Sequence, residues 1–505
     1  MSKKVIIVET SLSEFLSDEL ARREVVSRAD IVHFYDALVT GHELKSVLDC
    51  LSYYQGKSGV KLSMRLRMPG SDSAKPDERL CAALTEVIGT VDYIELDAQS
   101  DLTAPILALI PPNKRIITRK VEGDNVTSLL AHYQLDSTVD AHLYRYICDD
   151  GLMALEFLHQ LGQTNVTAYD AREEALWSRI CACYKGASVI FARFGKRSRV
   201  SLDWLQSNYN IAALPNQLKA LYGIIGASIA KSFSPLVHNT GLRALQSPTL
   251  YLTFKIDSLD ALHNHMARLA AIDLPILGLT VTAPLKAIIH TAFNANRAVV
   301  EQAQSGNVLI QRDDKMVVET TDDAGLTKVL EQHNITVKGK RIAVIGCGCS
   351  GRVSAYTLTT MGALVTLFNR SSAHSASAQA LLQLPCKPLA GFDAADFDVL
   401  INTVPFTREA DITFAVNRLN PKVVYIDFVY NPYPNKLLVH ARSRGLKVID
   451  GLSMLQSQLL SQFYCLTGQS LPPLASKALE RILNDKRKAG GALMDKTYPC
   501  LEKVS

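Results

Sequence analysis

The sequence predicts an α/β fold that begins with a (β/α)8 barrel and continues with two further α/β units. Three observations lead to this prediction. Eight short β-like runs alternate with helical stretches within residues 1–218. A second alternation of strands and helices starts at Leu221, after the linker-like segment Ala212–Gln217. A third unit opens at Lys340, where a buried-strand pattern runs directly into a glycine-rich turn.

The first unit has the strand count of a small barrel. Its helical periodicity is clearest over Asp18–Ser27 and Leu152–Leu161. Strands that alternate with helices favour parallel βαβ units, and eight such units fit the small end of the closed-barrel range. An open α/β sheet is the alternative. The predicted strands are Val5–Val8, Ile31–Tyr35, Val60–Leu66, Tyr93–Leu96, Arg115–Thr118, Leu143–Ile147, Asn165–Tyr169 and Ser188–Ala192.

The composition excludes several classes of protein. The chain of 505 residues is 48% hydrophobic and 20% charged, which excludes wholesale disorder. Its net charge of +5 is small, and its two basic runs, Lys196–Arg199 and Lys486–Lys488, fit solvated turns or helix ends better than a nucleic-acid surface. Apolar runs fall short of the roughly 18 residues of a membrane helix, and ten cysteines are scattered without disulfide or zinc-ligand spacing. We therefore expect a cytoplasmic protein with a small-molecule partner, no nucleic acid, no membrane and no metal; the oligomeric state is not readable.

The third unit contains a dinucleotide-binding pattern. The strand Arg341–Ile345 is followed at once by Gly346-Cys-Gly348-Cys-Ser-Gly351, then by a helical stretch and a second strand over Leu364–Phe368. In this context Gly346 permits the tight turn, Gly348 lets the backbone approach a pyrophosphate, and Gly351 allows the helix to pack closely on the strand. The helix N-terminus then faces the phosphates with its free N–H groups.

The end of the second strand indicates which dinucleotide is bound. An acid at this place would accept a hydrogen bond from the ribose 2′-hydroxyl of NAD. This chain has Asn369, Arg370 and Ser371 instead, and an arginine suits a 2′-phosphate. The sequence therefore predicts NADP, with a surface arginine that binds no ligand as the alternative.

A series of short motifs runs between residues 221 and 470. They are Gly226–Asn239 (GASIAKSFSPLVHN), Thr280–Lys286 (TVTAPLK), Ser305–Asn307 (SGN), Thr321–Asp322, Asn369–Ser371 (NRS), Tyr430–Pro432 (YNP) and Gly451–Gln458 (GLSMLQSQ). In their order and spacings these motifs resemble shikimate dehydrogenase, the NADP enzyme that reduces 3-dehydroshikimate.

This resemblance implies a role for each matching residue. Lys286 and Asp322 match the catalytic pair, in which an ammonium beside a carboxylate can hydrogen-bond the reacting oxygen and move its proton. Ser232, Ser234 and Tyr430 match hydroxyl donors to the substrate carboxylate. The partners of the ring hydroxyls and of the catalytic lysine are Thr282, Asn307 and Gln458. The cofactor-binding residues are Gly346, Gly348, Gly351, Asn369, Arg370, Ser371 and Gly451.

The match to this family has departures, none of which removes the catalytic pair. They are Lys231 in place of histidine, Thr280 and Thr320 in place of asparagine, Val308 in place of threonine, and Cys347 and Cys349 in place of small loop residues.

The N-terminal barrel resembles a type I 3-dehydroquinate dehydratase, so the whole chain is similar to bifunctional dehydratase–dehydrogenase fusions. That family forms a Schiff base through a lysine on the sixth strand, with a histidine after the fifth strand as proton shuttle. The sixth strand here carries Arg145, whose guanidinium stays protonated and cannot act as an amine nucleophile. The fifth strand ends in Thr118-Arg119-Lys120, without a histidine. We predict that the barrel folds but catalyses no dehydration.

Other barrel positions of that family are partly kept. Val32 and Phe34 stand where the family has glutamate and arginine, whereas Asp36 persists and Ser178-Arg179 resembles a substrate-binding dipeptide.

These assignments predict five segments. They are the barrel (1–218), a substrate-binding domain (219–328), a Rossmann NADP domain (329–450), C-terminal helices that return to the substrate domain (451–484) and a basic tail (485–505). The predicted function is the reversible NADP-dependent reduction of 3-dehydroshikimate to shikimate in aromatic amino acid biosynthesis. Two alternatives stay open: a fully bifunctional enzyme in which another lysine, such as Lys120, forms the imine, and a non-catalytic regulator that binds pathway metabolites.

Overall fold

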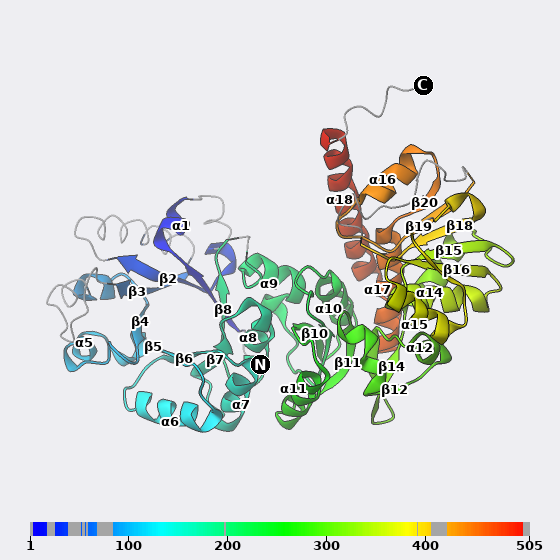
Figure 1. Ribbon diagram of the computed structural model, residues 1–505. Helices are drawn as coiled ribbons and strands as arrows, with labels where there is room; N and C mark the ends of the chain where they lie inside the picture. The colour runs from blue at the N-terminus through cyan, green and yellow to red at the C-terminus, as the bar shows by residue number, and fades with distance from the viewer. Residues whose placement is uncertain are drawn as a thin grey trace. The chain divides into compact units, whose positions relative to one another are not determined.

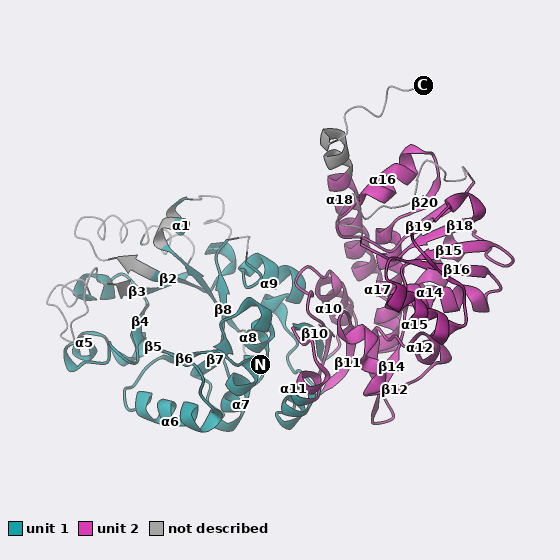
Figure 2. Cartoon of the chain, in the orientation of Figure 1, with its two compact units in different colours: residues 1–220, 248–254, 264–275 teal, residues 221–247, 255–263, 276–505 magenta. Residues whose placement is uncertain are grey.

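The computed structural model describes residues 4–17, 26–38, 52, 56, 59–67, 84–195, 198–390, 392–405 and 422–497. They form two compact units, coloured separately in Figure 2. The first unit comprises residues 1–220, 248–254 and 264–275, and the second comprises residues 221–247, 255–263 and 276–505. Most of the predicted helix Asp18–Ser27 and the basic residues Lys196 and Arg197 lie outside the described residues.

The first unit is a nearly closed barrel of eight parallel strands, as predicted (Figure 1). The sheet order is β7-β6-β5-β4-β3-β2-β1-β8, so neighbours in sequence are neighbours in space, as right-handed βαβ units require. The strands are β1 (Val5–Thr10), β2 (Ile31–Leu38), β3 (Lys61–Arg67), β4 (Tyr93–Asp97), β5 (Arg115–Lys120), β6 (Leu143–Cys148), β7 (Val166–Asp170) and β8 (Val189–Arg193).

The barrel has an apolar core to which almost every strand contributes. Ile7, Ile31, Ile116 and Phe191 are among the buried side chains that pack together there. Several helices start at side-chain caps; Asp150, for instance, accepts hydrogen bonds from two backbone N–H groups of the next turn. The described helices are α1 (Leu12–Ser17), α5 (Ala104–Leu109), α6 (Val126–Asp136), α7 (Gly151–Leu161), α8 (Leu176–Ala182) and α9 (Leu202–Tyr209), with short 3-10 turns η1 (Pro112–Lys114), η2 (Glu173–Ala175) and η3 (Ile211–Ala213).

A second sheet has six strands in the order β10-β9-β11-β13-β14-β12. Strand β11 pairs in parallel with β9 and antiparallel with β13, so this sheet is mixed. The strands are β9 (Ala220–Ile225), β10 (Thr249–Phe254), β11 (Ile276–Val281), β12 (Asn294–Ala295), β13 (Val308–Arg312) and β14 (Lys315–Glu319). The helical elements are α10 (Ser234–Ala244), α11 (Leu259–Ala271), η4 (Leu285–Ala287), η5 (Ile289–Thr291), α12 (Ala298–Ala303) and α13 (Asp322–Gln332).

The third sheet is parallel throughout, in the order β17-β16-β15-β18-β19-β20. Both faces of its central strand are buried, because Ile342 and Val344 pack into one apolar cluster while Ala343 and Ile345 pack into another. The order reverses between β15 and β18, and ligands of such sheets bind at this switch point. The strands are β15 (Arg341–Ile345), β16 (Leu364–Asn369), β17 (Cys386–Pro388), β18 (Val399–Asn402), β19 (Val424–Asp427) and β20 (Lys447–Ile449).

The helices of this last part include a long one at the C-terminal end. The elements are α14 (Cys349–Thr360), α15 (Ser372–Leu382), η6 (Ala394–Asp396), α16 (Lys436–Ser443), α17 (Gly451–Thr467) and α18 (Pro473–Thr497). The predicted start of a basic tail at residue 485 falls inside α18, so the helix continues where a tail was predicted. Among the described residues, none of the helices combines the length and the apolar character that crossing a membrane requires.

Candidate active site

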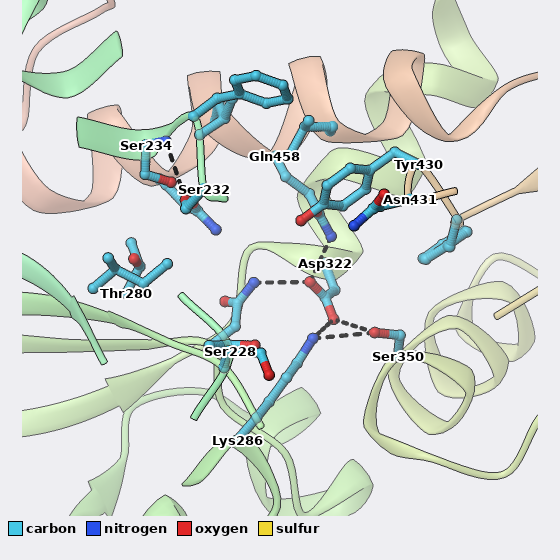
Figure 3. Close-up of a pocket in the computed structure, with 18 of the residues that line it drawn as sticks. Ser228, Ser232, Ser234, Thr280, Lys286, Asp322, Ser350, Tyr430, Asn431 and Gln458 are labelled. Atoms are coloured by element: carbon cyan, nitrogen blue, oxygen red, sulfur yellow. Dashed lines mark hydrogen bonds and ion pairs between the residues drawn. The ribbon is translucent and has the colours of Figure 1, made fainter. Parts of the chain in front are cut away.

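A cavity of about 470 Å³ in the second unit brings together residues that are far apart in the sequence. All of the predicted catalytic and substrate-binding residues line it: Ser232, Ser234, Thr282, Lys286, Asn307, Asp322, Tyr430 and Gln458. Figure 3 shows Ser232 and Ser234 at one side of this cavity, with Lys286 and Asp322 at another. The structure therefore collects the residues that the sequence motifs single out.

Lys286 and Asp322 form a directly bonded pair. Lys286 Nζ donates to Asp322 Oδ2 and, over 3.1 Å, to Ser350 Oγ. Ser350 Oγ also lies 3.2 Å from Asp322 Oδ2. The Asp322 side chain is fully buried, whereas 16% of the Lys286 side chain is exposed. An ammonium has three N–H donors, so these two partners leave one donor of Lys286 for a ligand.

Asp322 is held by amide donors on its other oxygen. Oδ1 accepts from Asn307 Nδ2 over 2.8 Å and from Gln458 Nε2 over 2.7 Å. Asp322 is also the first residue of α13, where the positive end of the helix dipole favours a carboxylate. Asn307 and Gln458, predicted as partners of ring hydroxyls and of the lysine, thus bond to the carboxylate of the pair.

Local turns fix the position of Lys286. Its backbone N–H donates to Thr282 O over 3.1 Å, and its carbonyl accepts from the N–H of Gly306 over 3.2 Å. A Cβ at Gly306 would lie 2.0 Å from Val318 Cγ1, so this close approach requires glycine. The absence of a side chain at Gly306 thus lets the SGN motif pack against β14, while its N–H bonds to the lysine motif.

Two of the three hydroxyl groups predicted to bind a carboxylate, those of Ser232 and Ser234, lie together at the start of α10. The N–H of Ser234 donates to Ser232 Oγ over 3.2 Å, and Ser234 is 6% exposed. Burial raises the pKa of Tyr430, against the opposing effect of the positive charge of Lys286. Its phenol is therefore a neutral donor at physiological pH, which suits an anionic partner.

The glycine-rich turn has the shape that a dinucleotide pyrophosphate needs. Gly346 has φ +106°, and a Cβ at Gly351 would lie 1.9 Å from the carbonyl oxygen of Gly346. A Cβ at Gly348 would meet nothing within 4 Å, and no side chain caps the N-terminus of α14 that follows. The turn thus presents open backbone N–H groups at a helix N-terminus, and these residues fit the phosphates of a dinucleotide.

The three residues predicted to choose NADP lie at the end of β16. Asn369 Nδ2 donates to Ser371 O over 3.1 Å, and Ser371 Oγ caps α15 by accepting from His374 N over 3.3 Å. Arg370, between them, is exposed. Gly451 lies elsewhere: a Cβ there would be 2.3 Å from Val429 O, so the observed reason for this glycine is close backbone packing.

Sequence reasoning missed Ser350, although it lies inside the glycine motif between Cys349 and Gly351. Its hydroxyl contacts both members of the Lys286–Asp322 pair and lines the cavity. The available signal was its place in the first turn after the glycine-rich loop, which points toward the ligand. Lys231, one of the departures from the family pattern, also lines the cavity.

The barrel contains a second cavity, of about 460 Å³, at the carboxyl ends of its strands. Arg145 lies in its wall but is only 4% exposed and bonds to three protein side chains. It donates to Glu9 Oε1 over 2.6 Å and to the Tyr169 hydroxyl, and its Nη1 lies 3.5 Å from Glu95 Oε2. Glu95 in turn lies 2.5 Å from His33 Nε2.

Three other barrel residues singled out from the sequence, Arg119, Ser178 and Arg179, are buried and bond to groups within the barrel. Arg119 is buried and paired with Asp136, with Nε 2.9 Å from Oδ2. Ser178 and Arg179 are buried and bond to backbone groups of the barrel, Arg179 to Phe191 O over 3.0 Å. Lys120 lies at the end of β5, is exposed and lines the cavity. The side chain of Asp36 lies outside the described residues.

A dinucleotide cradle beside a Lys–Asp pair that can move a proton is the working arrangement of a nicotinamide-dependent oxidoreductase. Comparison with known proteins specifies the family. Residues 224–309 match the shikimate dehydrogenase substrate binding domain. This match confirms the resemblance to shikimate dehydrogenases that the motifs predict.

Individual relatives agree with the family match. The shikimate biosynthesis protein AroDE of Chlamydia pneumoniae is 32% identical over 258 residues, which cover 51% of this chain and 52% of that protein. The chain thus spans about half the length of this relative. A shikimate dehydrogenase (NADP(+)) of Pyrococcus abyssi is 29% identical over 256 residues, 49% of this chain and 92% of the relative. The crystal structure of shikimate dehydrogenase from Aquifex aeolicus aligns with 26% identity and a TM-score of 0.47, over 52% of this chain and 98% of that one.

Proposed function

We propose that the second unit catalyses the reversible reduction of 3-dehydroshikimate to shikimate with NADP. The observation that carries the proposal is the Lys286–Asp322 pair in the wall of a cavity beside the glycine-rich turn. The names of the matched relatives, shikimate dehydrogenase (NADP(+)) among them, support the same substrate and cofactor. Residues Gly346, Gly348 and Gly351 would hold the pyrophosphate, and Arg370 the 2′-phosphate.

The pair would act on the ring oxygen of the substrate. When bound, the dinucleotide supplies the hydride that the ring carbon accepts. Lys286 Nζ donates a hydrogen bond to the carbonyl oxygen and gives it a proton as alkoxide character develops. Asp322, fixed by Asn307 and Gln458, orients Lys286 and stabilises its positive charge. In the reverse direction, Lys286 removes the proton of the hydroxyl.

The serine end of the cavity would set the orientation of the substrate. Ser232 and Ser234 bring hydroxyl groups to a side of the cavity separate from Lys286, and Tyr430 brings a third hydroxyl beside Gln458 (Figure 3). A carboxylate held there places the opposite part of a small ring near the Lys286–Asp322 pair. Such positioning converts binding energy into the alignment that the reaction needs.

We also propose that the barrel is not a dehydratase. Arg145 occupies the predicted lysine position and is bound by Glu9, Glu95 and Tyr169, and an arginine provides no uncharged amine for an imine.

The scattered cysteines and a reaction between small soluble molecules fit a cytoplasmic protein without nucleic-acid or membrane partners.

Two assays test these proposals, one for each part of the chain. The purified chain, given shikimate and NADP, is expected to form NADPH, and its turnover should be slower when NAD replaces NADP. Given 3-dehydroquinate and borohydride, it is expected to gain no covalent mass adduct. If shikimate binds without any NADPH formation, the regulator hypothesis replaces the enzyme; an adduct on a barrel lysine would restore the bifunctional one.

A further inference from the structure

Lys231 lines the cavity, and Lys486, from a distant part of the second unit, lies beside two aromatic rings that line it. Lys231 lines the cavity directly before Ser232 and is exposed. Lys486 belongs to α18, and its Nζ lies 5.3 Å from the ring centre of Phe233 and 5.5 Å from that of Tyr430. Both rings also line the cavity. Contacts of this kind between an ammonium and aromatic faces are attractive, and here they hold Lys486 over the residue predicted to bind a carboxylate.

These two ammonium groups repel each other. Burial, and after it the positive charge of Lys231, lowers the pKa of Lys486. Among the residues that the structure describes, neither lysine forms an ion pair with a carboxylate. Two like charges placed together without a counter-ion are unfavourable in the free protein. An anion bound beside them would remove that repulsion.

The position of Lys486 is fixed by its neighbour on α18. Arg487 donates to both oxygens of Asp450, each over 3.2 Å, and Asp450 also caps α17 by accepting from Ser453 N over 2.9 Å. Although burial opposes it, hydrogen bonds from Arg487 and Tyr433 lower the pKa of Asp450 to about 2. The same helix α17 carries Gln458, which bonds to Asp322. The anchor that orders the base of α17 therefore also places Lys486.

We propose that Lys486, with Lys231, binds the carboxylate of the substrate and gives the site its preference for anionic ring substrates. This inference rests on the proposed dehydrogenase function and extends it: the hydroxyls of Ser232, Ser234 and Tyr430 orient the carboxylate, and the two lysines supply its opposite charge. The part of the chain predicted as a basic tail thereby belongs to the substrate site.

The test compares two lysines of one helix in the full-length chain. Lys486→Met removes the charge over Tyr430. Lys488→Met removes the same charge from an exposed position two residues further on, which a helix turns by about 200° away. Hydrogen bonds to charged groups contribute about 1.5–3 kcal/mol, so Lys486→Met should raise the KM for shikimate roughly 10- to 100-fold with kcat nearly unchanged. Lys488→Met should leave KM as it is, and Lys486→Arg should recover most of the loss.

An uncharged substrate separates a charge effect from a structural one. With the methyl ester of shikimate, the parent should show a raised KM and Lys486→Met should differ little from it. The KM for shikimate should also rise with salt in the parent and much less in Lys486→Met. An unchanged KM for shikimate in Lys486→Met, or an equal loss with acid and ester, would overturn the inference while leaving the dehydrogenase function in place.

Binding by calorimetry distinguishes failure of the function from failure of the inference. If the parent binds shikimate without oxidising it, and Lys486→Met loses that binding, the lysine site stands and the dehydrogenase function fails. If the parent neither binds nor oxidises shikimate, both are wrong.

Discussion

The barrel cluster (Glu9, His33, Glu95, Arg145 and Tyr169) and the pocket pair Lys286–Asp322 are both buried groups of opposite charge, yet they differ in what they can do. Both side chains line a cavity, but that of Arg145 is 5% exposed and bonds to Glu9, Glu95 and Tyr169, whereas that of Lys286 is 16% exposed and bonds to Asp322 and Ser350. A guanidinium also keeps its proton, while an ammonium can release one. The pocket pair can therefore take part in acid–base chemistry, and we propose a structural role for the barrel cluster.

The two carboxylates of the barrel cluster, those of Glu9 and Glu95, lie among positively charged side chains. Burial acts to raise the pKa of Glu9 and of Glu95, but the positive charges around them outweigh it, and both pKa values are lowered. Arg145 attracts both, and His33 attracts Glu95 most strongly. Removing one partner of such a buried network leaves an uncompensated charge, which is costly. We therefore expect that substitution of Lys286 lowers activity and that substitution of Arg145 lowers the stability of the barrel.

The largest effect is expected from Lys286→Met in the pocket pair. The change removes the proton donor and should lower kcat by about 10²–10⁴-fold, the usual contribution of a positioned acid or base. The KM for NADP should stay near that of the parent, because Lys286 is predicted to act on the substrate oxygen. Steady-state kinetics with shikimate and NADP measure both. If more than half of the parental kcat remained, Lys286 would be no proton donor.

Arg145→Met tests the barrel cluster by stability. Loss of one member of a buried ion-pair network costs about 3–5 kcal/mol, so the barrel should unfold at a lower urea concentration. The chain has two tryptophans, Trp177 and Trp204, and both lie in the first unit, so their fluorescence in the full-length chain follows that unit alone. Arg193→Met is the control, because Arg193 is an exposed arginine at the same cavity.

Acid adds a second readout to the barrel comparison. A carboxylate whose pKa is lowered by folding contributes stability that is present above its unfolded value, 4.5 here, and is lost as the pH falls through the folded value. The parental barrel should therefore lose stability below about pH 4.5. Arg145→Met, in which Glu9 and Glu95 lose an attracting charge, should lose less over the same range. A variant as stable as the parent, with the same acid dependence, would contradict a structural role for Arg145.

Much of the fold could be predicted because local patterns determine it. Each of the eight predicted barrel strands overlaps an observed one, and Arg341–Ile345 matches β15 in both bounds. Alternating apolar runs and glycine turns are local signals, so they can be read from the chain itself. The predicted basic tail begins at residue 485, inside α18. The sequence does not show that Arg487 there pairs with Asp450, 37 residues away, and this ion pair anchors the helix.

The candidate site likewise contains some features that could be predicted from the sequence and others that could not. The contact between Lys286 and Asp322 could be predicted only because the family motifs carry both residues; nothing local links Lys286 to Asp322, 36 residues further on. The contacts of Ser350 with Lys286 and of Lys486 with the Tyr430 ring were missed because they are tertiary contacts between distant parts of the sequence. For Arg145, the residue type alone predicted the loss of imine chemistry. Its hydrogen bonds to Glu9 and Tyr169, however, can be seen only in the folded structure.

The smallest effect is expected at Arg370, which carries the comparison to an exposed charge. Unlike Arg145 it lies at the surface, so its removal should leave stability unchanged within about 0.5 kcal/mol. If Arg370 binds the 2′-phosphate of NADP, Arg370→Ala should raise the KM for NADP about 10-fold, the value of one charge-assisted hydrogen bond, with kcat nearly constant. The KM for NAD, which lacks that phosphate, should not change, so the ratio of the KM for NAD to the KM for NADP should fall.

Arg341→Ala is the control, because Arg341 is exposed at the opposite, amino end of the same parallel sheet. An unchanged ratio of the two KM values in Arg370→Ala would show that another residue selects the cofactor.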